Sequence, residues 1–229
     1  MKDLSNIMLA LDNFTKEELI NKLTETKDDF KTIKIGLELF CKHGPQLINE
    51  IYDQFKHDIF LDLKLHDIPN TVRKSIKSLE GLPIKFLTIH LSGGEEMIKQ
   101  AIEQARESLP GVKILGVSYL TSLSENDFDE IWAIKKVDIP KAFGQLFKLA
   151  MQTKIDGIVC SASELEIIND LEKGHCQNLI KVCPGIRFKD EIENGDIQDQ
   201  NRVLDPKNAF MNGADYLVMG RSLTASKNM

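Results

Sequence analysis

Short apolar runs alternate with amphipathic segments along almost the whole chain. The runs have the length of buried strands and span residues 7–11, 32–36, 59–65, 86–90, 112–118, 157–160, 179–183 and 216–219. The segments between them predict helices at 16–26, 44–55, 70–79, 95–108, 140–151, 163–171 and 206–212. In residues 95–108, for example, apolar side chains recur at steps of three and four, as a core-facing helix requires. Strands that alternate with helices predict a parallel sheet.

The number of repeats and the length of the chain select between parallel architectures. Eight repeats in 229 residues favour a closed (β/α)8 TIM barrel over an open doubly wound sheet. No GxGxxG motif follows the first run, which weakens a dinucleotide-binding interpretation. No linker or low-complexity segment interrupts the pattern, so we expect a single domain over residues 1–229.

The third run carries an unusual pattern of charge. Leu61, Leu63 and Leu65 alternate with Asp62 and Lys64, which is typical of a strand with one face in water. In a parallel α/β protein, however, helices cover both faces of the sheet. A buried acid and amine need partners or a chemical task, because desolvated ions are costly. A solvated face and a functional site are both open at this point.

Composition limits the kinds of partner that the protein can bind and the cellular compartment in which we expect it. Hydrophobic residues at 42% and charged residues at 28% are ordinary for a globular protein, and no run approaches the ~20 apolar residues of a membrane span. A net charge of −6 argues against nucleic acid as a partner. The N-terminus lacks the build of a signal peptide, so we expect a cytoplasmic protein without a membrane partner. The cysteines form no CxxC pair, and we expect buried free thiols rather than a metal site at Cys41, Cys160, Cys176 and Cys183.

Polar and charged residues gather where the predicted strands end. In a (β/α)8 barrel the chemistry lies at this end of the strands. The residues concerned are Asp12, Lys34, Asp62, Lys64, Asp67, His90, Thr121, Pro184, Arg187, Gly220 and Arg221. Charge at the same end of so many strands favours a site over a solvated face. Because the chain is acidic overall, an anionic ligand would require the positive charge to be concentrated here.

Asp62 and Lys64 lie two residues apart on one strand face, within reach of each other. Lys34 on the neighbouring strand could contact Asp62 from the other side. Alternating acids and amines stabilise one another's charged forms. This favours protonated Lys64 as a general acid over a Schiff-base amine, which needs a depressed pKa. A purely structural ion-pair network is the alternative.

The loops after the seventh and eighth runs predict an anion site. Both carry glycine and arginine, at residues 184–187 and 220–221, in the usual phosphate position of this fold. Residues 188–205 between them are polar and without period, which suggests a lid containing Gln200 and Arg202, or else an unstructured loop. A lone histidine such as His90 is more often a hydrogen-bonded structural residue than a catalyst.

At residues 62–72 the chain reads DLKLHDIPNTV, which resembles the DxKxxDIPxT signature of the orotidine 5'-phosphate decarboxylase family. Further segments similar to that family extend over essentially the whole chain. They are LALD at 9–12, KIGLE at 34–38, His90 with Gly93 and Gly94, LTS at 120–122, PGIR at 184–187, DQNR at 199–202 and GADYLVMGRS at 213–222.

The resemblance implies a carboxy-lyase of pyrimidine biosynthesis that converts orotidine 5'-monophosphate to UMP and CO2 without a cofactor. It implies that Lys64 protonates C6 of the pyrimidine, that Asp62 lies beside the substrate carboxylate, and that Lys34 holds Asp62 and the ribose. It also implies a homodimer with shared sites, because three residues would reach the partner's site: Asp67, Ile68 and Thr71. Further substrate contacts would come from Asp12 to the ribose, Thr121 and Pro184 to the base, and Gln200, Arg187, Gly220 and Arg221 to the phosphate.

Two departures and two rivals accompany the resemblance. Leu91 stands where the family commonly has alanine, and the chain ends soon after the GRS motif, so we expect the final helix to be short or missing. The first rival is a sister barrel that shares the DxKxxD core but depends on Mg²⁺, such as a 3-keto-6-phosphogulonate decarboxylase or a hexulose-phosphate synthase. The second is a catalytically silent barrel that binds a phosphorylated ligand.

Overall fold

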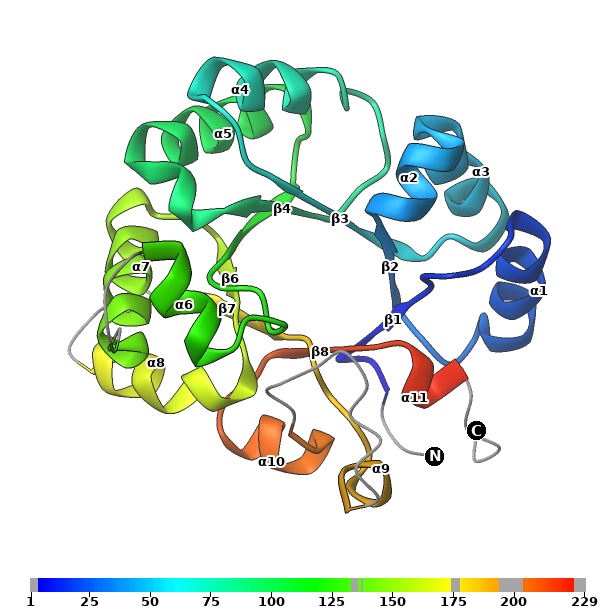
Figure 1. Ribbon diagram of the computed structural model, residues 1–229. Coiled ribbons are helices and arrows are strands. Elements are labelled where there is room, and N and C mark those ends of the chain that lie inside the picture. The colour runs from blue at the N-terminus through cyan, green and yellow to red at the C-terminus, as the bar shows by residue number, and fades with distance from the viewer. Residues whose placement is uncertain (1–3, 133–135, 137, 174–177, 194–203, 225–229) are drawn as a thin grey trace.

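The computed structural model describes residues 4–132, 136, 138–173, 178–193 and 204–224. Within these residues, eight parallel strands close into a barrel in chain order, with β8 paired to β1 (Figure 1). The predicted (β/α)8 barrel is therefore confirmed. The strands are β1 (Ile7–Ala10), β2 (Thr32–Gly36), β3 (Asp58–Leu65), β4 (Phe86–His90), β5 (Lys113–Val117), β6 (Gly157–Val159), β7 (Ile180–Cys183) and β8 (Tyr216–Met219).

Helices surround the barrel on its outer side (Figure 1). The predicted ones match, within two residues at each end, α1 (Lys16–Thr26), α3 (Pro45–Phe55), α4 (Pro69–Lys77), α5 (Gly94–Ser108), α7 (Ile139–Thr153), α8 (Leu165–Glu172) and α10 (Pro206–Met211). Short helices that the periodicity did not predict are α2 (Leu37–His43), α6 (Glu125–Trp132), α9 (Lys189–Glu193), α11 (Arg221–Thr224) and the 3-10 turns η1 (Leu91–Gly93) and η2 (Ala162–Glu164).

Local signals fix where several helices begin. The Thr15 side chain accepts a hydrogen bond from the Glu18 amide, and the Glu18 carboxylate accepts one from the Thr15 amide, so a capping box starts α1. Pro69 occupies the first turn of α4 directly after β3, where its missing N–H costs no hydrogen bond. Asp205 caps α10 by accepting from the Asn208 amide. The chain therefore turns from strand to helix at the end of the barrel where the polar residues gather.

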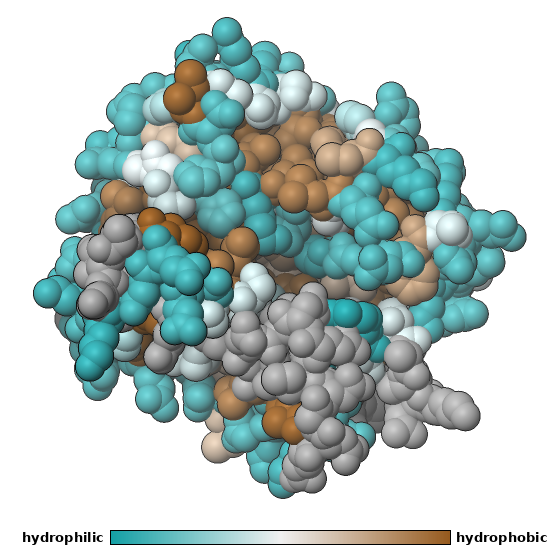
Figure 2. Space-filling view, viewed as in Figure 1, coloured by the Kyte–Doolittle hydropathy of each residue, from teal (hydrophilic) through white to brown (hydrophobic). Residues whose placement is uncertain are grey.

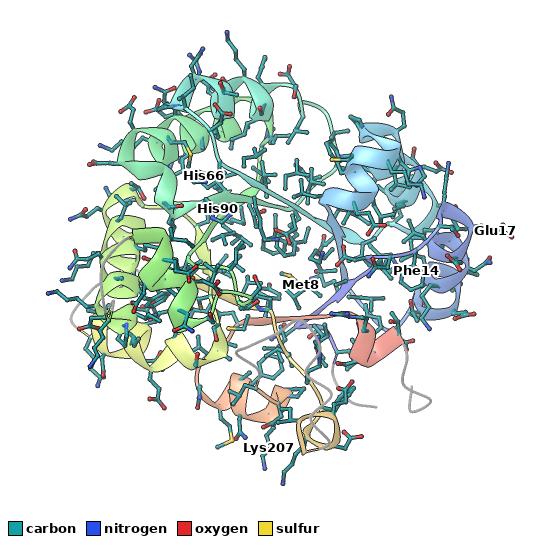
Figure 3. All side chains as sticks on the ribbon, in the orientation of Figure 1. Met8, Phe14, Glu17, His66, His90 and Lys207 are labelled. Atoms are coloured by element: carbon teal, nitrogen blue, oxygen red, sulfur yellow. The ribbon has the colours of Figure 1, made fainter. Side chains whose placement is uncertain are left out.

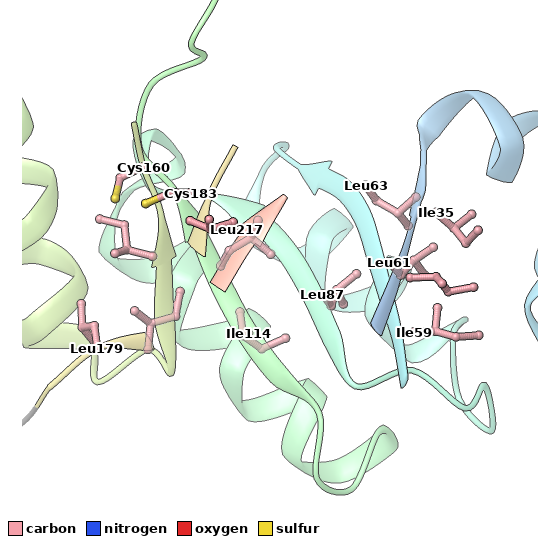
Figure 4. Packing of buried hydrophobic residues seen from close by; sticks show 14 of the residues in the cluster. Ile35, Ile59, Leu61, Leu63, Leu87, Ile114, Cys160, Leu179, Cys183 and Leu217 are labelled. Carbon is pink, nitrogen blue, oxygen red and sulfur yellow. The ribbon is translucent and has the colours of Figure 1, made fainter. Parts of the chain in front are cut away.

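The core has two layers. The larger layer lies between the strands and the helices, and Figure 4 shows part of it. A smaller layer fills the barrel itself, with Met8 near its centre in Figure 3. It consists of Met8, Ala10, Phe60, Phe86, Leu115, Val117, Val159, Val182 and Val218. These side chains fill the barrel interior, and in this fold the functional site lies at the carboxyl ends of the strands.

An irregular stretch in β3 shapes this end of the barrel. β3 pairs with β4 through Leu61 and Leu87 and again through Leu65 and Ile89, so three residues of β3 lie opposite the single residue between Leu87 and Ile89. One of the three, Lys64, has φ of 48°, a left-handed conformation that is unfavourable for a residue with a side chain. A bulge of this kind re-aims side chains next to a site.

The departure at Leu91 is compensated within the fold. The Leu91 side chain is fully buried and packs over Gly116 of β5, where an added Cβ would lie 2.4 Å from a Leu91 methyl group. Glycine at one position thus makes room for leucine at the other.

The remaining expectations have mixed outcomes. After β8 the described chain holds the helix α11 up to Thr224, and the residues that follow lie outside the described part, so the shortened final helix stays a prediction.

Cys160 and Cys183 are buried free thiols as predicted (Figure 4), but the prediction was wrong for Cys41, which is exposed on the unpredicted helix α2. Cys176 lies outside the described residues. Among the helices that the structure describes, none is long and apolar enough to cross a membrane.

Candidate active site

A cavity of about 400 Å³ opens at the carboxyl ends of the strands. A volume of this size suits a small-molecule ligand. Residues predicted from strand ends far apart in the sequence meet in its wall: Asp12, Lys34, Asp62, Lys64, Thr121, Pro184, Arg187, Gly220 and Arg221. Because the barrel brings all parallel strand ends to one rim, the clustering follows directly from the fold.

Acids and amines alternate along one side of this cavity. The Lys34 ammonium lies 2.8 and 3.0 Å from the two carboxylate oxygens of Asp12 and 3.9 Å from Oδ2 of Asp62. The Lys64 ammonium lies 2.6 Å from the same Oδ2. The order across β1, β2 and β3 is therefore Asp12, Lys34, Asp62, Lys64, and each charged side chain has a neighbour of opposite charge.

The Asp62 carboxylate is the centre of this series. Its residue is 8% exposed, and burial alone would raise the pKa of the carboxyl group. The ammonium groups of Lys64 and Lys34 outweigh burial, together with hydrogen bonds from Lys64 and from Thr88 of β4, so that the pKa lies below its ordinary value. Asp62 is therefore an anion at neutral pH and an ion-pair partner of Lys64.

Lys64 and Lys34 both line the cavity but differ in how exposed their side chains are. The Lys34 side chain is 9% exposed and lies between two acids, whereas the Lys64 side chain is 31% exposed. Among the described residues, Asp62 is the one acid within ion-pair distance of Lys64. One side of the Lys64 ammonium thus remains available to a ligand in the cavity, and a fixed ammonium in this position can act as a general acid.

The wall of the cavity after β7 and β8, across the barrel from β3 and Lys64, is cationic. Arg187 is 6% exposed, and its Nη1 donates to the Ile186 carbonyl at 2.9 Å, while its Nε is buried with no partner in the described part of the chain. Arg221 follows Gly220 at the end of β8, where a Cβ on the glycine would approach the Ala10 carbonyl to 3.2 Å. Arginine side chains next to close backbone suit a phosphate or another anion.

Several predicted residues do not reach the cavity of their own chain. Asp67, Ile68 and Thr71 follow β3, and none of them lines the cavity. The Asp67 carboxylate accepts from the Ile68 amide at 2.7 Å. Ile68 is 66% exposed and Leu37 is 50% exposed, and Figure 2 shows apolar surface between α2 and α4. Gln200 and Arg202 lie outside the described residues, together with most of the expected lid.

His90 lies at the end of β4 beside the cavity but does not line it. Its ring is 5.1 Å from that of His66, centroid to centroid (Figure 3). Burial first, and then the neighbouring His66 and Lys64, lower the pKa of His90 to about 4. The ring is therefore neutral at physiological pH, which agrees with a packing residue better than with a proton donor.

Other residues of the site escaped the sequence prediction. Asn13, Tyr119 and Ser122 also line the cavity, on loops without a periodic pattern that could have placed them. Thr88 binds Asp62 from behind. The sequence did hold a signal for Thr88, because it is a polar residue in the middle of an apolar strand. The prediction relied on charged residues and therefore did not include it.

No group of three or more His, Cys, Asp or Glu side chains in the described residues could hold a metal ion. The cavity carboxylates, Asp12 and Asp62, instead accept from lysine ammonium groups. The site therefore combines a lysine side chain, fixed by the Asp62 carboxylate, with arginines on the far wall. Such a pair of features can bind a phosphorylated compound and deliver a proton to its other end.

Comparison with known proteins gives consistent results. Residues 5–229 match the model of the orotidine 5'-phosphate decarboxylase / HUMPS family. The orotidine 5'-phosphate decarboxylase of Staphylococcus aureus (strain Newman) is 39% identical over 228 residues, covering 100% of this chain and 94% of that protein. The Staphylococcus saprophyticus enzyme of the same name is 40% identical and covers 96% of this chain and 92% of its own. The crystal structure of orotidine 5'-phosphate decarboxylase from Lactobacillus acidophilus superposes with a TM-score of 0.79 at 31% identity, covering 98% and 93% of the two chains.

Proposed function

The chain belongs to the orotidine 5'-phosphate decarboxylase / HUMPS family, and we propose that it is an orotidine 5'-phosphate decarboxylase, a carboxy-lyase (EC 4.1.1.23). The reaction converts orotidine 5'-monophosphate to UMP and CO2 in pyrimidine biosynthesis. One observation carries the proposal: the Lys64 ammonium, held 2.6 Å from a buried carboxylate, reaches into a cavity with arginines on its far wall. The relatives that bear the name of this activity match over nearly the whole chain.

The chemistry requires a cation at a defined place. When the bond between C6 and the carboxylate breaks, CO2 leaves and the electron pair stays on C6, where the pyrimidine ring delocalises it poorly. A fixed ammonium at that carbon stabilises the developing charge without reorganisation. Lys64 then gives its proton to C6, and the neutral amine is reprotonated from water. Asp62 holds the Lys64 ammonium in place before the substrate arrives.

The neighbours of Lys64 have separate tasks in this proposal. Asp62 fixes the ammonium and lies beside the substrate carboxylate. Lys34, which is bonded to Asp12 at 2.8 Å, holds Asp62 in place, and the two residues Lys34 and Asp12 face the ribose hydroxyls. No cofactor takes part in these steps.

The far wall binds the phosphate. Arg187 and Arg221 supply charge-assisted hydrogen bonds, and Gly220 lets the backbone approach closely. Gln200, which lies outside the described residues, is assigned to the phosphate by the family resemblance alone, and Thr121 and Pro184 contact the base. Binding energy from the phosphate holds the pyrimidine over Lys64, which is how a remote group can raise the rate of the chemical step.

The active unit in this proposal is a homodimer with shared sites. Asp67, Ile68 and Thr71 stay out of their own cavity, and the exposed apolar side chains of Ile68 and Leu37 offer a surface for a second copy. Asp67 would then place a second acid beside Lys64 of the partner.

Mixing two inactive variants tests the shared site. Lys64→Ala and Asp67→Ala damage different chains of each site, so mixed dimers carry one intact site and should regain part of the activity. A mixture that stays inactive, although subunit exchange is demonstrated by mass spectrometry, contradicts the shared arrangement.

An absorbance assay with orotidine 5'-monophosphate tests the activity itself. We expect turnover that is unchanged by EDTA and that Lys64→Met abolishes. Lys113→Met is a matched control, because Lys113 pairs with Asp156 near the other end of the barrel and should keep full activity. Complete loss on chelation would instead favour the Mg²⁺-dependent sister barrels, and full activity of Lys64→Met would refute the mechanism.

We further propose that residues 1–229 act as a single domain in the cytoplasm, with neither nucleic acid nor membrane as a partner. The net charge of −6 and the lack of a membrane-spanning helix in the described residues support this assignment. Cell fractionation tests it, and activity recovered with membranes would contradict it.

A further inference from the structure

Thr88 is a buried polar residue of the barrel that lies behind the Asp62–Lys64 pair. It is 0% exposed and lies on β4 opposite the bulge of β3. Its neighbours on β4, Leu87 and Ile89, pair with Leu61 and Leu65 on either side of the bulge. It does not line the cavity, so it cannot contact a ligand there. Its hydroxyl group is nevertheless bonded to both residues on which the proposed chemistry depends, Asp62 and Lys64.

The direction of these two hydrogen bonds is fixed by the groups involved. The Lys64 backbone amide can only donate, and it donates to Oγ1 of Thr88 at 2.8 Å. The ionised Asp62 carboxylate can only accept, and its Oδ1 accepts from the same hydroxyl at 2.8 Å. Thr88 thus uses its single proton on the carboxylate and a lone pair on the amide. One side chain bonds the two ends of the bulge at once.

The bulge explains why the Lys64 amide bonds to a side chain. Lys64 has a left-handed φ of 48°, and it lies where the register between β3 and β4 shifts, so its amide needs a partner other than the regular ladder. Thr88 supplies that partner. The same hydroxyl holds Oδ1 of Asp62, which leaves Oδ2 to the Lys64 ammonium at 2.6 Å.

We propose that Thr88 is a positioning residue for the decarboxylation: its buried hydroxyl locks the Asp62 carboxylate and the Lys64 backbone in one arrangement, so that the ammonium is presented to the cavity at a fixed place. This inference rests on the proposed function. It predicts that loss of the hydroxyl lowers the rate of the chemical step more than it weakens nucleotide binding.

Three substitutions separate positioning from mere packing. Thr88→Val keeps the shape and removes both hydrogen bonds, Thr88→Ser keeps the hydroxyl, and Thr88→Cys replaces it with a weak donor. We expect kcat to fall about 10- to 100-fold in the valine variant, the range for a misplaced catalytic group, with KM within about threefold of its original value. Serine should stay within about threefold in kcat, and cysteine should lie between serine and valine.

Thr153 supplies the matched control. Its hydroxyl is also buried, but it donates to the carbonyls of Leu149 and Ala150 within α7. None of these three residues lines the cavity. Thr153→Val removes a buried hydroxyl of the same kind and should lower the melting temperature while kcat is unchanged. Should Thr88→Val fail to fold, the comparison of cysteine with serine carries the test. A valine or cysteine variant with the kcat of the original protein overturns the proposal.

Two readouts are independent of turnover. Carbon-13 NMR of aspartate side chains should show that the pKa of Asp62 rises in Thr88→Val, because the bond from Thr88 is one cause that lowers it, beside Lys64 and Lys34. Hydrogen exchange should show faster exchange in a peptide that contains Lys64. An unchanged Asp62 titration and unchanged exchange refute the positioning role. If the original protein does not decarboxylate the nucleotide, the proposed function fails, and these readouts still decide whether Thr88 fixes the pair.

Discussion

Replacing Asp62 with asparagine distinguishes two tasks that this carboxylate could have. It could repel the carboxylate of the bound substrate, or it could hold the Lys64 ammonium in place. The structure shows the contacts of the second task directly, at 2.6 Å to Lys64 and 3.9 Å to Lys34. We therefore expect Asp62→Asn to lower kcat chiefly through the loss of a fixed ammonium.

The expected magnitudes differ between the two tasks. Two like charges ~4 Å apart repel by ~4 kcal/mol at an effective dielectric of ~20, so relief of repulsion would tighten substrate binding by about 10³-fold. Misplacing a catalytic group by about 1 Å costs about 100-fold in rate, so loss of the fixed ammonium should lower kcat by about that factor. The first effect acts on substrate affinity and the second acts on the rate.

The assay compares substrate and product on the same variant. UMP lacks the carboxylate, so repulsion by Asp62 should affect the affinity for orotidine 5'-monophosphate and leave that for UMP unchanged. We expect both Kd values, measured by calorimetry and single-turnover kinetics, to change in parallel by less than about tenfold. A variant that binds the substrate about 10³-fold more tightly than before, with UMP unaffected, would refute the reasoning and make repulsion the main task.

Further predictions concern packing and pH. Leu91→Ala should destabilise the fold by about 2–5 kcal/mol and Gly116→Ala by about 1–3 kcal/mol, but the double variant should be more stable than their sum predicts, as urea unfolding can measure. Gly36→Ala should lower nucleotide affinity in calorimetry, because its Cβ would lie 2.6 Å from the Asp12 carboxylate. The pKa of His90 is depressed to about 4 from 6.5, so its contribution to stability is complete above pH 6.5 and is lost as the pH falls toward 4. His90→Asn should flatten this part of the stability profile by ~1 kcal/mol, a figure reduced for solvent screening.

The sequence predicted the strands because buried strands and amphipathic helices leave different periods in the chain. It did not predict α2, which follows β2 without a loop and has Gly36 as an N-cap that offers no side-chain hydrogen bond. α11 and α9 are too short to show a period. These helices depend on the tertiary environment more than on their own sequence.

The charged site could be predicted in part for a similar reason. Asp62 and Lys64 stand out because alternation with leucine places them on one face. The bulge between them could not be predicted. It is defined by the pairing of β3 with β4, and the sequence of one strand does not determine that register. The proposed role of Asp67 is a different case, because a residue that served another chain would leave no signature in the geometry of its own.

The distribution of charge over the cavity makes a final prediction about substrate orientation. Asp12, Lys34, Asp62 and Lys64 carry two positive and two negative charges that balance, whereas Arg187 and Arg221 add positive charge at the ends of β7 and β8, away from Lys64 on β3. A phosphate is therefore drawn to the arginines, and the base is left over Lys64. Orotidine without its phosphate forfeits charged hydrogen bonds of about 1.5–3 kcal/mol each, and because remote binding energy is used in the chemical step, kcat should fall together with affinity. Steady-state kinetics on orotidine measure both. Turnover at the kcat of the nucleotide would show that the neutral half of the cavity positions the base unaided.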